Sequence, residues 1–420
     1  MEDEFGVPTA PIVTARFADY VLRDGRTRGM NLRWTFPPYP VGWVSRETLH
    51  GYVQGNDPIS GAPIMEEIVA ALTQPLTDTE KNSKITRPPR RPRLLGEETE
   101  SNLHRFFLEN AWTDGLPIIL PTEERVAEML TGTDHDPQEV VGMMTVTTHE
   151  EMLEYTVERV AVNAVMAGAR PEHLPVILAI ASSQHPSIPS STGSYGSMVV
   201  VNGPVRHEIG MNSGGGAMGP FNYANSVIGR AWTLMSINFG DARLGDTFMA
   251  TIGNGSSFTN QCCAENEERS DWEPFHVRNG FAPGESTVSL FRGWNVLTLG
   301  VGGAKNILGR MKELQFTGAF TFVLDPLVAA GLKKDEGYDN PRQLSEWLAK
   351  ELNSPRVKPE NINFVVVGGE TNPIWETTDY VYYKTVSVDK WIPKDGIRRD
   401  ERPLRMPTGV TCADDSCGIN

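Results

Sequence analysis

The feature that most constrains the fold is an alternation of short apolar runs with longer amphipathic segments in the second half of the chain. The short runs are rich in β-branched and aromatic residues, which is typical of buried strands. They are SMVVVNG (197–203), TFMATIG (247–253), STVSLFR (286–292), NVLTLG (295–300), GAFTFVLD (318–325) and INFVVVGGE (362–370). Segments with helical spacing lie between them, at 222–240, 303–315 and 340–352. Strands that alternate with helices predict an α/β domain with a mostly parallel or mixed sheet.

Helical patterns also precede this region, at 100–112 and as two consecutive apolar helices within 147–183. Thr148 and Glu151 have the spacing of a capping box, and Gly168 stands where a glycine ends a helix. No internal repeat is evident in the sequence. Because both helices of the pair are apolar nearly all round, we expect them to be buried between layers.

A smaller α/β unit is predicted at the N-terminus. VPTAPIV (7–13) and NLRWTF (31–36) have the composition of strands and flank a helix-like segment, and a second helical pattern covers 64–74. Strand, helix and strand in this order favour parallel pairing through a right-handed crossover. Prolines among arginines then predict an extended linker. The expected organisation is a small α/β unit at 1–80, a linker at 81–97, a large α/β domain at 98–405 and a tail at 406–420.

Charge and composition limit the partners and the compartment. Lysine and arginine number 38 against 53 aspartates and glutamates, a net charge of −15, so no general positive field exists to attract nucleic acid or an anionic membrane. No apolar run approaches the ~20 residues of a membrane span, and the N-terminus is acidic where a signal peptide is basic. Four cysteines in 420 residues make no disulfide framework. We therefore expect a cytoplasmic protein with reduced thiols.

Polar residues that follow the strand at 197–203 form the first candidate site. In open α/β sheets, ligands bind outside the carboxyl ends of strands. The triple glycine allows backbone N–H groups to approach a carboxylate or phosphate, and an arginine nearby offers a bidentate clamp. A surface loop without a ligand is the alternative. The candidate binding residues are Asn202, Arg206, Asn212, Ser213, Gly214, Gly215 and Gly216, with His207 as a candidate catalytic residue.

The segment QCCAENEERSDWEPFHV (261–277) is the second candidate site. Strand alternation predicts that the two adjacent cysteines point to opposite faces. One hypothesis makes Cys262 a nucleophile with Glu265, Asn266 or His276 as its base. Nearby carboxylates raise the pKa of a thiol, so a second hypothesis gives proton transfer to Glu265 or Glu267 while the cysteine packs. A purely structural role for the segment is the third possibility.

Other motifs add little chemistry. Asp114, on a turn between predicted helices, is a candidate substrate-binding acid or a turn former. Cys412 and Cys417 stand near the C-terminus and form a four-thiolate zinc site only if they meet Cys262 and Cys263, so we expect no bound metal and a disordered tail. GVGGAK (300–305) lacks the third glycine of a dinucleotide fingerprint, and no Walker or haem motif occurs. The cofactor, if any, is unknown from the sequence.

Several stretches of the chain resemble the UGSC-like family, which is named for a selenocysteine- or cysteine-Gly-Ser-Cys motif. FGVPTAPIVTARFADY, PYPVGW and IMEEIVAALTQPLT are similar to its small domain. VVNGPVRHEIGMNSGGGAMGPFNYANSVIGRA and AENEERSDWEPFHVRNGF are similar to its large companion region and are the more specific of the matches. The resemblance covers most of the chain and implies a group suspected of thiol or selenol redox chemistry.

The Gly-Ser-Cys motif itself does not occur in this chain, and the resemblance places it just before EDEFGVPTAP. The resemblance therefore implies a thiol on a separate polypeptide, a reading frame that continues upstream through a selenocysteine codon, or a branch without thiol chemistry. The expected function is an enzyme for a small polar or anionic organic substrate, with reductive or lyase cleavage of a carbon–heteroatom bond. The alternatives are a substrate-binding subunit whose partner protein carries the thiol or selenol, and a cofactor-free hydrolase using Cys262. A homo-oligomer is also possible.

Overall fold

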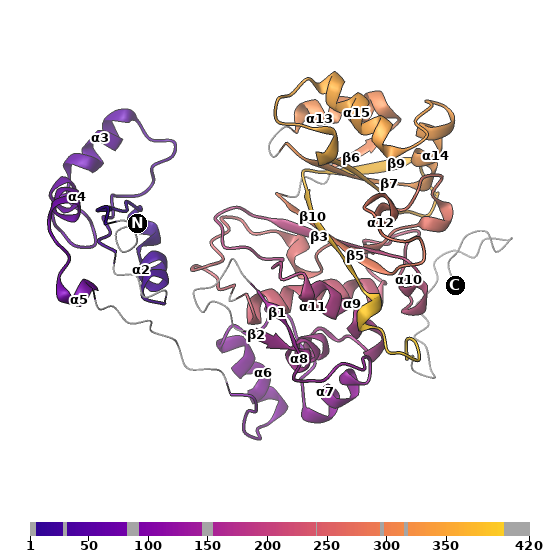
Figure 1. Cartoon of the computed structure of the whole chain (residues 1–420), viewed down its shortest axis with the longest axis horizontal. Coiled ribbons are helices and arrows are strands. Elements are labelled where there is room, and N and C mark those ends of the chain that lie inside the picture. Colours follow the sequence, from indigo (N-terminus) through magenta and orange to yellow (C-terminus); the bar gives the residue numbers. More distant parts are fainter. Residues whose placement is uncertain are drawn as a thin grey trace. The chain divides into compact units, whose positions relative to one another are not determined.

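The structure is a computed structural model that describes residues 6–27, 32–81, 92–144, 154–240, 242–294, 298–314 and 318–398. The chain forms two compact units, one comprising Met1–Gly96 with Thr148–Glu151 and the other Glu97–Thr147 with Met152–Asn420 (Figure 1). None of the helices among the described residues combines the length and the apolar character that a membrane crossing requires. The predicted capping box at Thr148 and Glu151, Cys412, Cys417 and the predicted tail lie outside the described residues.

The first unit is built mainly from helices around a small core. Its helices are α2 (Ala18–Thr27), α3 (Arg46–Gln54), α4 (Ile64–Thr73) and α5 (Asp78–Lys81). The two predicted strands are reduced to a single parallel bridge between Ile12 and Thr35, because only Ala18, Val21 and Phe36 are buried there as an apolar cluster. The pairing is parallel, as predicted from the order of the segments, but the strands are too short to form a sheet.

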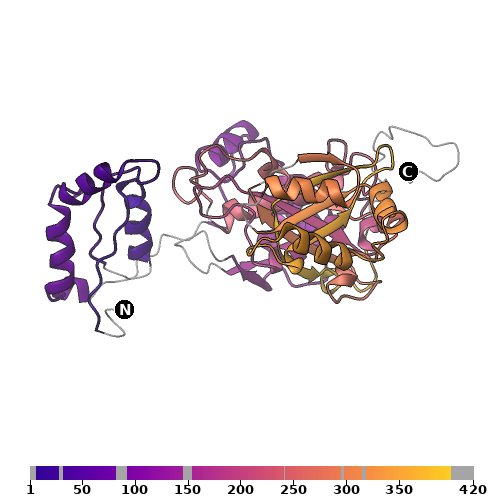
Figure 2. The ribbon, with the colours of Figure 1, turned by 90° about the horizontal axis from the view of Figure 1, so that it is seen from above.

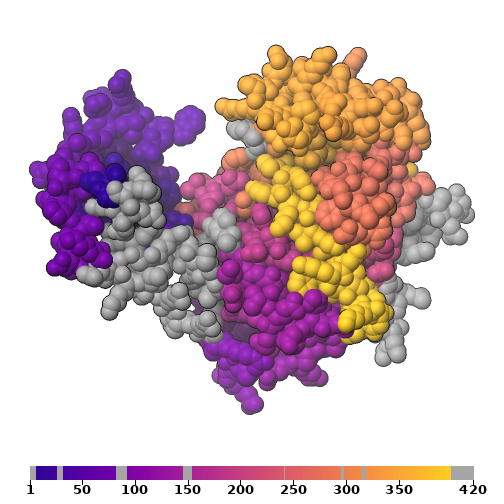
Figure 3. All heavy atoms as spheres, in the orientation of Figure 1, coloured from indigo at the N-terminus to yellow at the C-terminus, as the bar shows by residue number. Residues whose placement is uncertain are grey.

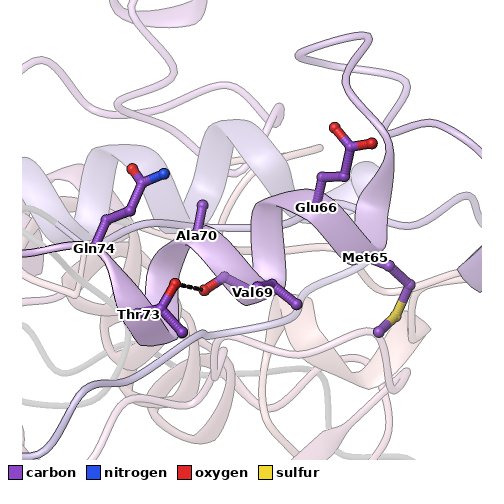
Figure 4. Close-up of a pocket in the computed structure, with 6 residues that line it drawn as sticks. All are labelled: Met65, Glu66, Val69, Ala70, Thr73 and Gln74. Carbon is purple, nitrogen blue, oxygen red and sulfur yellow. Dashed lines mark hydrogen bonds between the residues drawn. The ribbon is translucent and has the colours of Figure 1, made fainter.

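A hollow of about 360 Å³ lies on the exposed side of α4 (Figure 4). Its lining includes a single titratable group, Glu66, and is otherwise apolar or uncharged: Met65, Val69, Ala70, Thr73 and Gln74. This lining offers no pair of groups suited to acid–base chemistry.

The second unit contains two four-stranded mixed sheets, which confirms the predicted α/β class. The first sheet has the order β10-β5-β3-β4 and the second the order β6-β9-β7-β8. In each sheet one pair is parallel, β3 with β4 and β7 with β8, and the other pairs are antiparallel. The strands are β3 (Gly196–Asn202), β4 (Cys262–Ala264), β5 (Thr287–Gly293), β6 (Thr298–Val301), β7 (Phe320–Leu324), β8 (Ile362–Val366), β9 (Ile374–Thr378) and β10 (Val381–Ser387).

The two sheets lie face to face between two layers of helices (Figure 1). Helices α9 (Leu174–Ser182) and α11 (Tyr223–Asn238) pack on the first sheet, with α8 (Val157–Ala167) packed against both of them. Helices α13 (Ala304–Glu313), α14 (Pro326–Lys334) and α15 (Pro341–Leu352) pack on the second sheet. Figure 2, seen from the side of α13 and α15, shows these helices in front of the strands. Side chains from both sheets meet in one apolar cluster that includes Met198, Val200, Phe291, Val323 and Val365. We call this cluster the inter-sheet core.

Three strands of each sheet share one topology although the sequence shows no repeat. In the first, β3 leads through α11 to its parallel neighbour β4, and β5 then pairs with the other side of β3. In the second, β7 leads through α14 and α15 to its parallel neighbour β8, and β9 then pairs with the other side of β7. The hydrogen-bond pattern and the connectivity of these three strands therefore repeat in the second sheet, although the side chains differ.

Several local predictions are corrected. Residues 247–253 form no strand and make only an isolated bridge at Phe248, because this segment contacts the loop at Ser191 instead of a sheet edge. The first of the two apolar helices begins at Val157 with Thr156 as its N-cap, after a short strand, β2 (Glu154–Thr156), which pairs with β1 (Val140–Met143). Gly168 ends that helix in a left-handed conformation, φ 85°, as predicted.

The C-terminal part of the described chain runs along one side of the second unit, as the yellow surface in Figure 3 shows. After β10, the main chain passes η6 (Asp389–Trp391) and contacts the loop that follows α7 (Glu123–Leu130). Thr133 Oγ1 donates to the carbonyl of Trp391, and the backbone N–H of Lys394 donates to Asp134. The remaining helices are α6 (Glu100–Glu109), α10 (Val205–Glu208) and α12 (Phe275–Arg278).

Candidate functional site

The parallel strands of both sheets end at the same edge of the second unit. β3 and β4 end at Asn202 and Ala264, and the next residues reach the end of β8: the backbone N–H of Asn266 donates to the carbonyl of Val366 at 2.8 Å. We call this region the carboxyl edge, and it comprises residues 202–207, 213–216, 265–269, 325 and 368–370. Both sequence-predicted segments are present there.

Glu265 ties the two sheets together inside the carboxyl edge. Its Oε2 accepts from Asn202 Nδ2 at 2.6 Å and from the backbone N–H of Phe275 at 2.7 Å. Its Oε1 faces Arg278 Nη2 at 3.9 Å and the backbone N–H of Val366 at 3.4 Å. Burial raises the pKa of Glu265, while the Arg278 charge and the hydrogen bonds from Phe275 and Asn202 oppose that rise. The carboxyl group is fully buried, so its position suits an internal link better than contact with a substrate.

Arg206 is at the centre of an ion network in front of Glu265. Its Nε donates to the carbonyl of Gly203, and its Nη1 donates to the carbonyl of Glu265 at 2.6 Å and to Glu268 at 3.2 Å. Its Nη2 lies 2.9 Å from Glu268 and 3.0 Å from Glu267. Four of these contacts are hydrogen bonds, and Glu267 adds an ion pair. Arg206 therefore fixes the segment 265–268, and its charge is paired with glutamates of the chain instead of serving as the anion clamp expected from the sequence.

Glu267 and Glu268 differ in exposure and in partners. Glu267 accepts from Asn202 Nδ2 at 2.9 Å and from the backbone N–H of Gly203 at 2.8 Å, and its side chain is 12% exposed. Glu268 is half exposed and lies 2.8 Å from His207 Nε2. Burial acts to raise the pKa of Glu268, but the hydrogen bonds from Arg206 and His207 outweigh it and lower the pKa to about 2. Glu268 is therefore an ionised carboxylate beside an exposed imidazole at neutral pH.

The glycine loop (213–216) is fixed by hydrogen bonds to neighbouring residues, and part of it is exposed to solvent. Asn212 Nδ2 donates to Asn222 Oδ1 at 2.8 Å, and Asn212 Oδ1 accepts from the backbone N–H of Gly214 at 2.9 Å. The carbonyl of Ser213 accepts from the backbone N–H of Gly368 at 3.0 Å, while Gly215 and Gly216 are exposed. A Cβ on Gly369 would lie 2.6 Å from the backbone nitrogen of Gly215, so the two glycine turns approach closely because neither carries a side chain.

One residue joins the two predicted segments. The N–H of Gly368 contacts Ser213 in the glycine loop, and its carbonyl accepts from Asn266 Nδ2 at 2.9 Å in the acidic segment. The glycine loop and the acidic segment are therefore neighbours at the carboxyl edge.

The cysteines are a correction to the nucleophile hypothesis. Strand alternation does send them to opposite faces: Cys263 enters the inter-sheet core, and Cys262 lies under α11 against Gly229. Both are unbridged and buried. Burial raises the pKa of Cys262 well above its usual value and, with Glu265 and Glu376, raises that of Cys263 to about 12. Cys262 is therefore a protonated thiol without access to a surface substrate, and the Cys hydrolase alternative loses its nucleophile.

His276 and Asp114 also take roles other than those expected. The His276 ring is fully buried, and neither of its nitrogens has a hydrogen-bond partner among the described residues, so no route leads from it to a surface substrate. Asp114 makes a bidentate pair with Arg230 of α11, at 2.8 and 2.9 Å, and its side chain is only 3% exposed. This pair fixes the turn before α7 to the helical layer, which places Asp114 away from the carboxyl edge.

Sequence reasoning did not single out several residues of the carboxyl edge. Asp325 follows β7 and accepts from the backbone N–H of Glu370 at 3.0 Å, and burial raises its pKa against the hydrogen bonds from Leu327 and Glu370. Glu370, at φ 59°, pairs with Arg269 at 2.5 Å. The sequence contains a pattern that indicates these residues, because Asp325 and Glu370 stand at the ends of two predicted strands, where polar residues and glycines also follow β3. No group of three or more His, Cys, Asp or Glu side chains within the described ranges is placed to hold a metal ion.

Comparisons of the chain with protein-family models, with curated proteins and with solved structures gave no match. The geometry of the carboxyl edge and the resemblance of short segments are therefore what supports a function.

Proposed function

We propose that the chain is an enzyme that moves protons on a small polar or anionic organic substrate at the carboxyl edge and cleaves a carbon–heteroatom bond as a lyase. The observation that carries the proposal is the exposed His207 imidazole at 2.8 Å from Glu268, with Glu268 fixed in turn by Arg206. Histidine changes its charge near neutral pH, and a carboxylate beside it orients the ring and stabilises its protonated form.

In the proposed reaction, His207 takes a proton from the carbon next to the one that bears the leaving group. The electron pair of that C–H bond forms the new double bond, and the carbon–heteroatom bond breaks with its electrons on the heteroatom. The imidazolium then returns its proton to the leaving group. Glu268 stays ionised throughout, because its pKa of about 2 lies far below that of an imidazole.

The charges at the carboxyl edge restrict how a substrate is held. Arg206 and Arg269 are both paired with glutamates, Glu267 and Glu268 for the first and Glu370 for the second. A carboxylate or carbonyl of the substrate would therefore be held by backbone N–H groups of the exposed Gly215 and Gly216, which need no counter-charge from a side chain.

The test is proton exchange at carbon, which is the first half of the reaction. Small hydroxy-, amino- and thio-substituted carboxylic acids are incubated in D₂O with the purified chain, and loss of the C–H signal is followed by proton NMR. His207→Gln is expected to slow the exchange about 10²-fold or more, because general base catalysis contributes 10²–10⁴. His104→Gln is the matched control, since His104 also lies near a glutamate, Glu100, but on α6. Unchanged exchange in His207→Gln would contradict the proposal.

A second candidate function is a substrate-binding subunit whose partner protein carries a thiol or selenol that cleaves the substrate reductively. The burial of Cys262 and Cys263 favours it, because neither of these two thiols is open to a substrate and a partner would supply the reactive sulfur. The resemblance to the UGSC-like family is consistent with such a partner. This candidate predicts no exchange or turnover by the chain alone and turnover after a Gly-Ser-Cys peptide or protein is added.

A further inference from the structure

Phe221 has a backbone conformation that its side chain makes costly. Its φ is 72°, in the left-handed region that bulky residues rarely adopt, and its side chain is 70% exposed. A phenylalanine that bears backbone strain and gains little burial is not explained by packing. Strained residues of this kind concentrate at ligand-binding sites.

The neighbours of Phe221 hold it in this conformation. Pro220 precedes it with a fixed φ. Asn222 follows it, and its Nδ2 donates to the carbonyls of Gly216 at 2.6 Å, Ala217 at 3.2 Å and Gly219 at 3.0 Å. Ala217 in turn belongs to the inter-sheet core. The loop is therefore anchored on both sides of Phe221, and the ring is presented outward on the same loop as Gly215 and Gly216.

Glycine would be the unstrained choice at this position, and the loop already has glycines at 214, 215, 216 and 219. We propose that Phe221 is a specificity-determining residue whose ring forms a platform for a planar, aromatic or unsaturated part of the substrate. This inference rests on the proposed function in one respect, since it places the polar end of the substrate at the carboxyl edge. Aromatic rings prefer flat partners that stack on them with an offset.

The experiment separates strain from binding with two variants. Phe221→Ala removes the ring and keeps a Cβ at the strained position, whereas Phe221→Gly removes both. We expect Phe221→Gly to unfold about 2 °C above Phe221→Ala, because only glycine relieves the left-handed strain. The binding probes are benzamide and cyclohexanecarboxamide, which are neutral and share one carbon skeleton but differ in planarity. Affinities are measured by ligand-observed NMR titration.

We expect the unaltered chain to bind benzamide about fivefold more tightly than cyclohexanecarboxamide, and both variants to lose this preference. Equal affinities in the unaltered chain, or an unchanged preference in the variants, would overturn the platform. A Phe221→Gly protein that is no more stable than Phe221→Ala, or that fails to fold, would overturn the strain argument. His207→Gln is expected to keep the preference for benzamide, so failure of the proton-transfer proposal and failure of this inference give different results.

Discussion

Replacement of Glu265 by alanine is expected to be among the most destabilising single changes in the second unit. The carboxylate receives hydrogen bonds from Asn202 and from the backbone of Phe275, and it lies 3.9 Å from Arg278 Nη2. Alanine leaves two buried N–H groups without an acceptor, at about 1–3 kcal/mol each. Alanine also removes a charge partner of Arg278, whose guanidinium keeps its hydrogen bonds to the carbonyls of Glu273 and Phe364.

These contributions overlap, because neighbouring losses are not additive. We therefore expect a decrease of about 2–5 kcal/mol in the free energy of unfolding for Glu265→Ala. Glu265→Gln keeps the volume and one acceptor oxygen but not the charge, so about half of that loss is expected. The matched control is Glu273→Ala on the same segment. Glu273 is exposed, and Arg278 Nε donates to its backbone carbonyl, which alanine keeps.

The assay is urea unfolding followed by tryptophan fluorescence and by circular dichroism, so that the transitions of the two units are distinguished. Glu273→Ala is expected to stay within about 0.5 kcal/mol of the unaltered chain. The double variant Glu265→Ala/Arg278→Met should lose less than the sum of the single variants, because removal of both charges leaves no unpaired ion. A decrease of less than about 1.5 kcal/mol in the free energy of unfolding for Glu265→Ala would contradict the role of Glu265 as a link between the sheets.

Three further predictions use other parts of the second unit. A Cβ on Gly229 would lie 1.8 Å from the carbonyl oxygen of Thr259, so Gly229→Ala should lower the free energy of unfolding by about 3 kcal/mol or more. A Cβ on Gly309 of α13 would meet nothing within 4 Å, so Gly309→Ala should raise the free energy of unfolding by up to about 1 kcal/mol. Thermal unfolding of both variants checks the two expectations. In a variant with serine at the two C-terminal cysteines, Cys262 and Cys263 should react with iodoacetamide only after unfolding, because burial raises the pKa of both thiols, and rapid labelling of the folded chain would contradict this. The folded pKa of Glu268 is lower than its unfolded value of 4.5, so its contribution to stability is present above pH 4.5 and is lost as the pH falls toward 2. Glu268→Gln should therefore lose less stability than the unaltered chain between pH 5 and pH 3, and parallel curves would refute the assignment.

The sequence predicts the strands of the second unit best where the pattern is strongest. The runs that became β3, β5, β7 and β8 are buried on both faces, and a continuous β-branched run signals this environment directly. The run TFMATIG was also predicted to be a strand but contacts the loop at Ser191 instead of a sheet, and its composition does not indicate this. The sequence also did not predict that the strands form two sheets packed face to face, because the residues that cover a buried face lie far away along the chain.

The two candidate segments lie side by side in the structure, because residues after parallel neighbouring strands reach the same edge of a sheet. The contacts that their side chains make were not predictable. They join residues about 60 positions apart, such as Arg206 with Glu267 and Glu268. The reactivity of Cys262 depended on α11, whose Gly229 allows the helix to cover the thiol. Neither contact can be predicted from the spacing of residues in the sequence.

The position of β10 has a consequence for how the protein is made. The segment that builds the whole second sheet, from β6 to β9, is inserted between β5 and its neighbour β10. During synthesis, the outer strand that shields β5 therefore leaves the ribosome only after the whole segment from β6 to β9 has been made, so the nascent first sheet keeps an uncovered hydrogen-bonding edge until then.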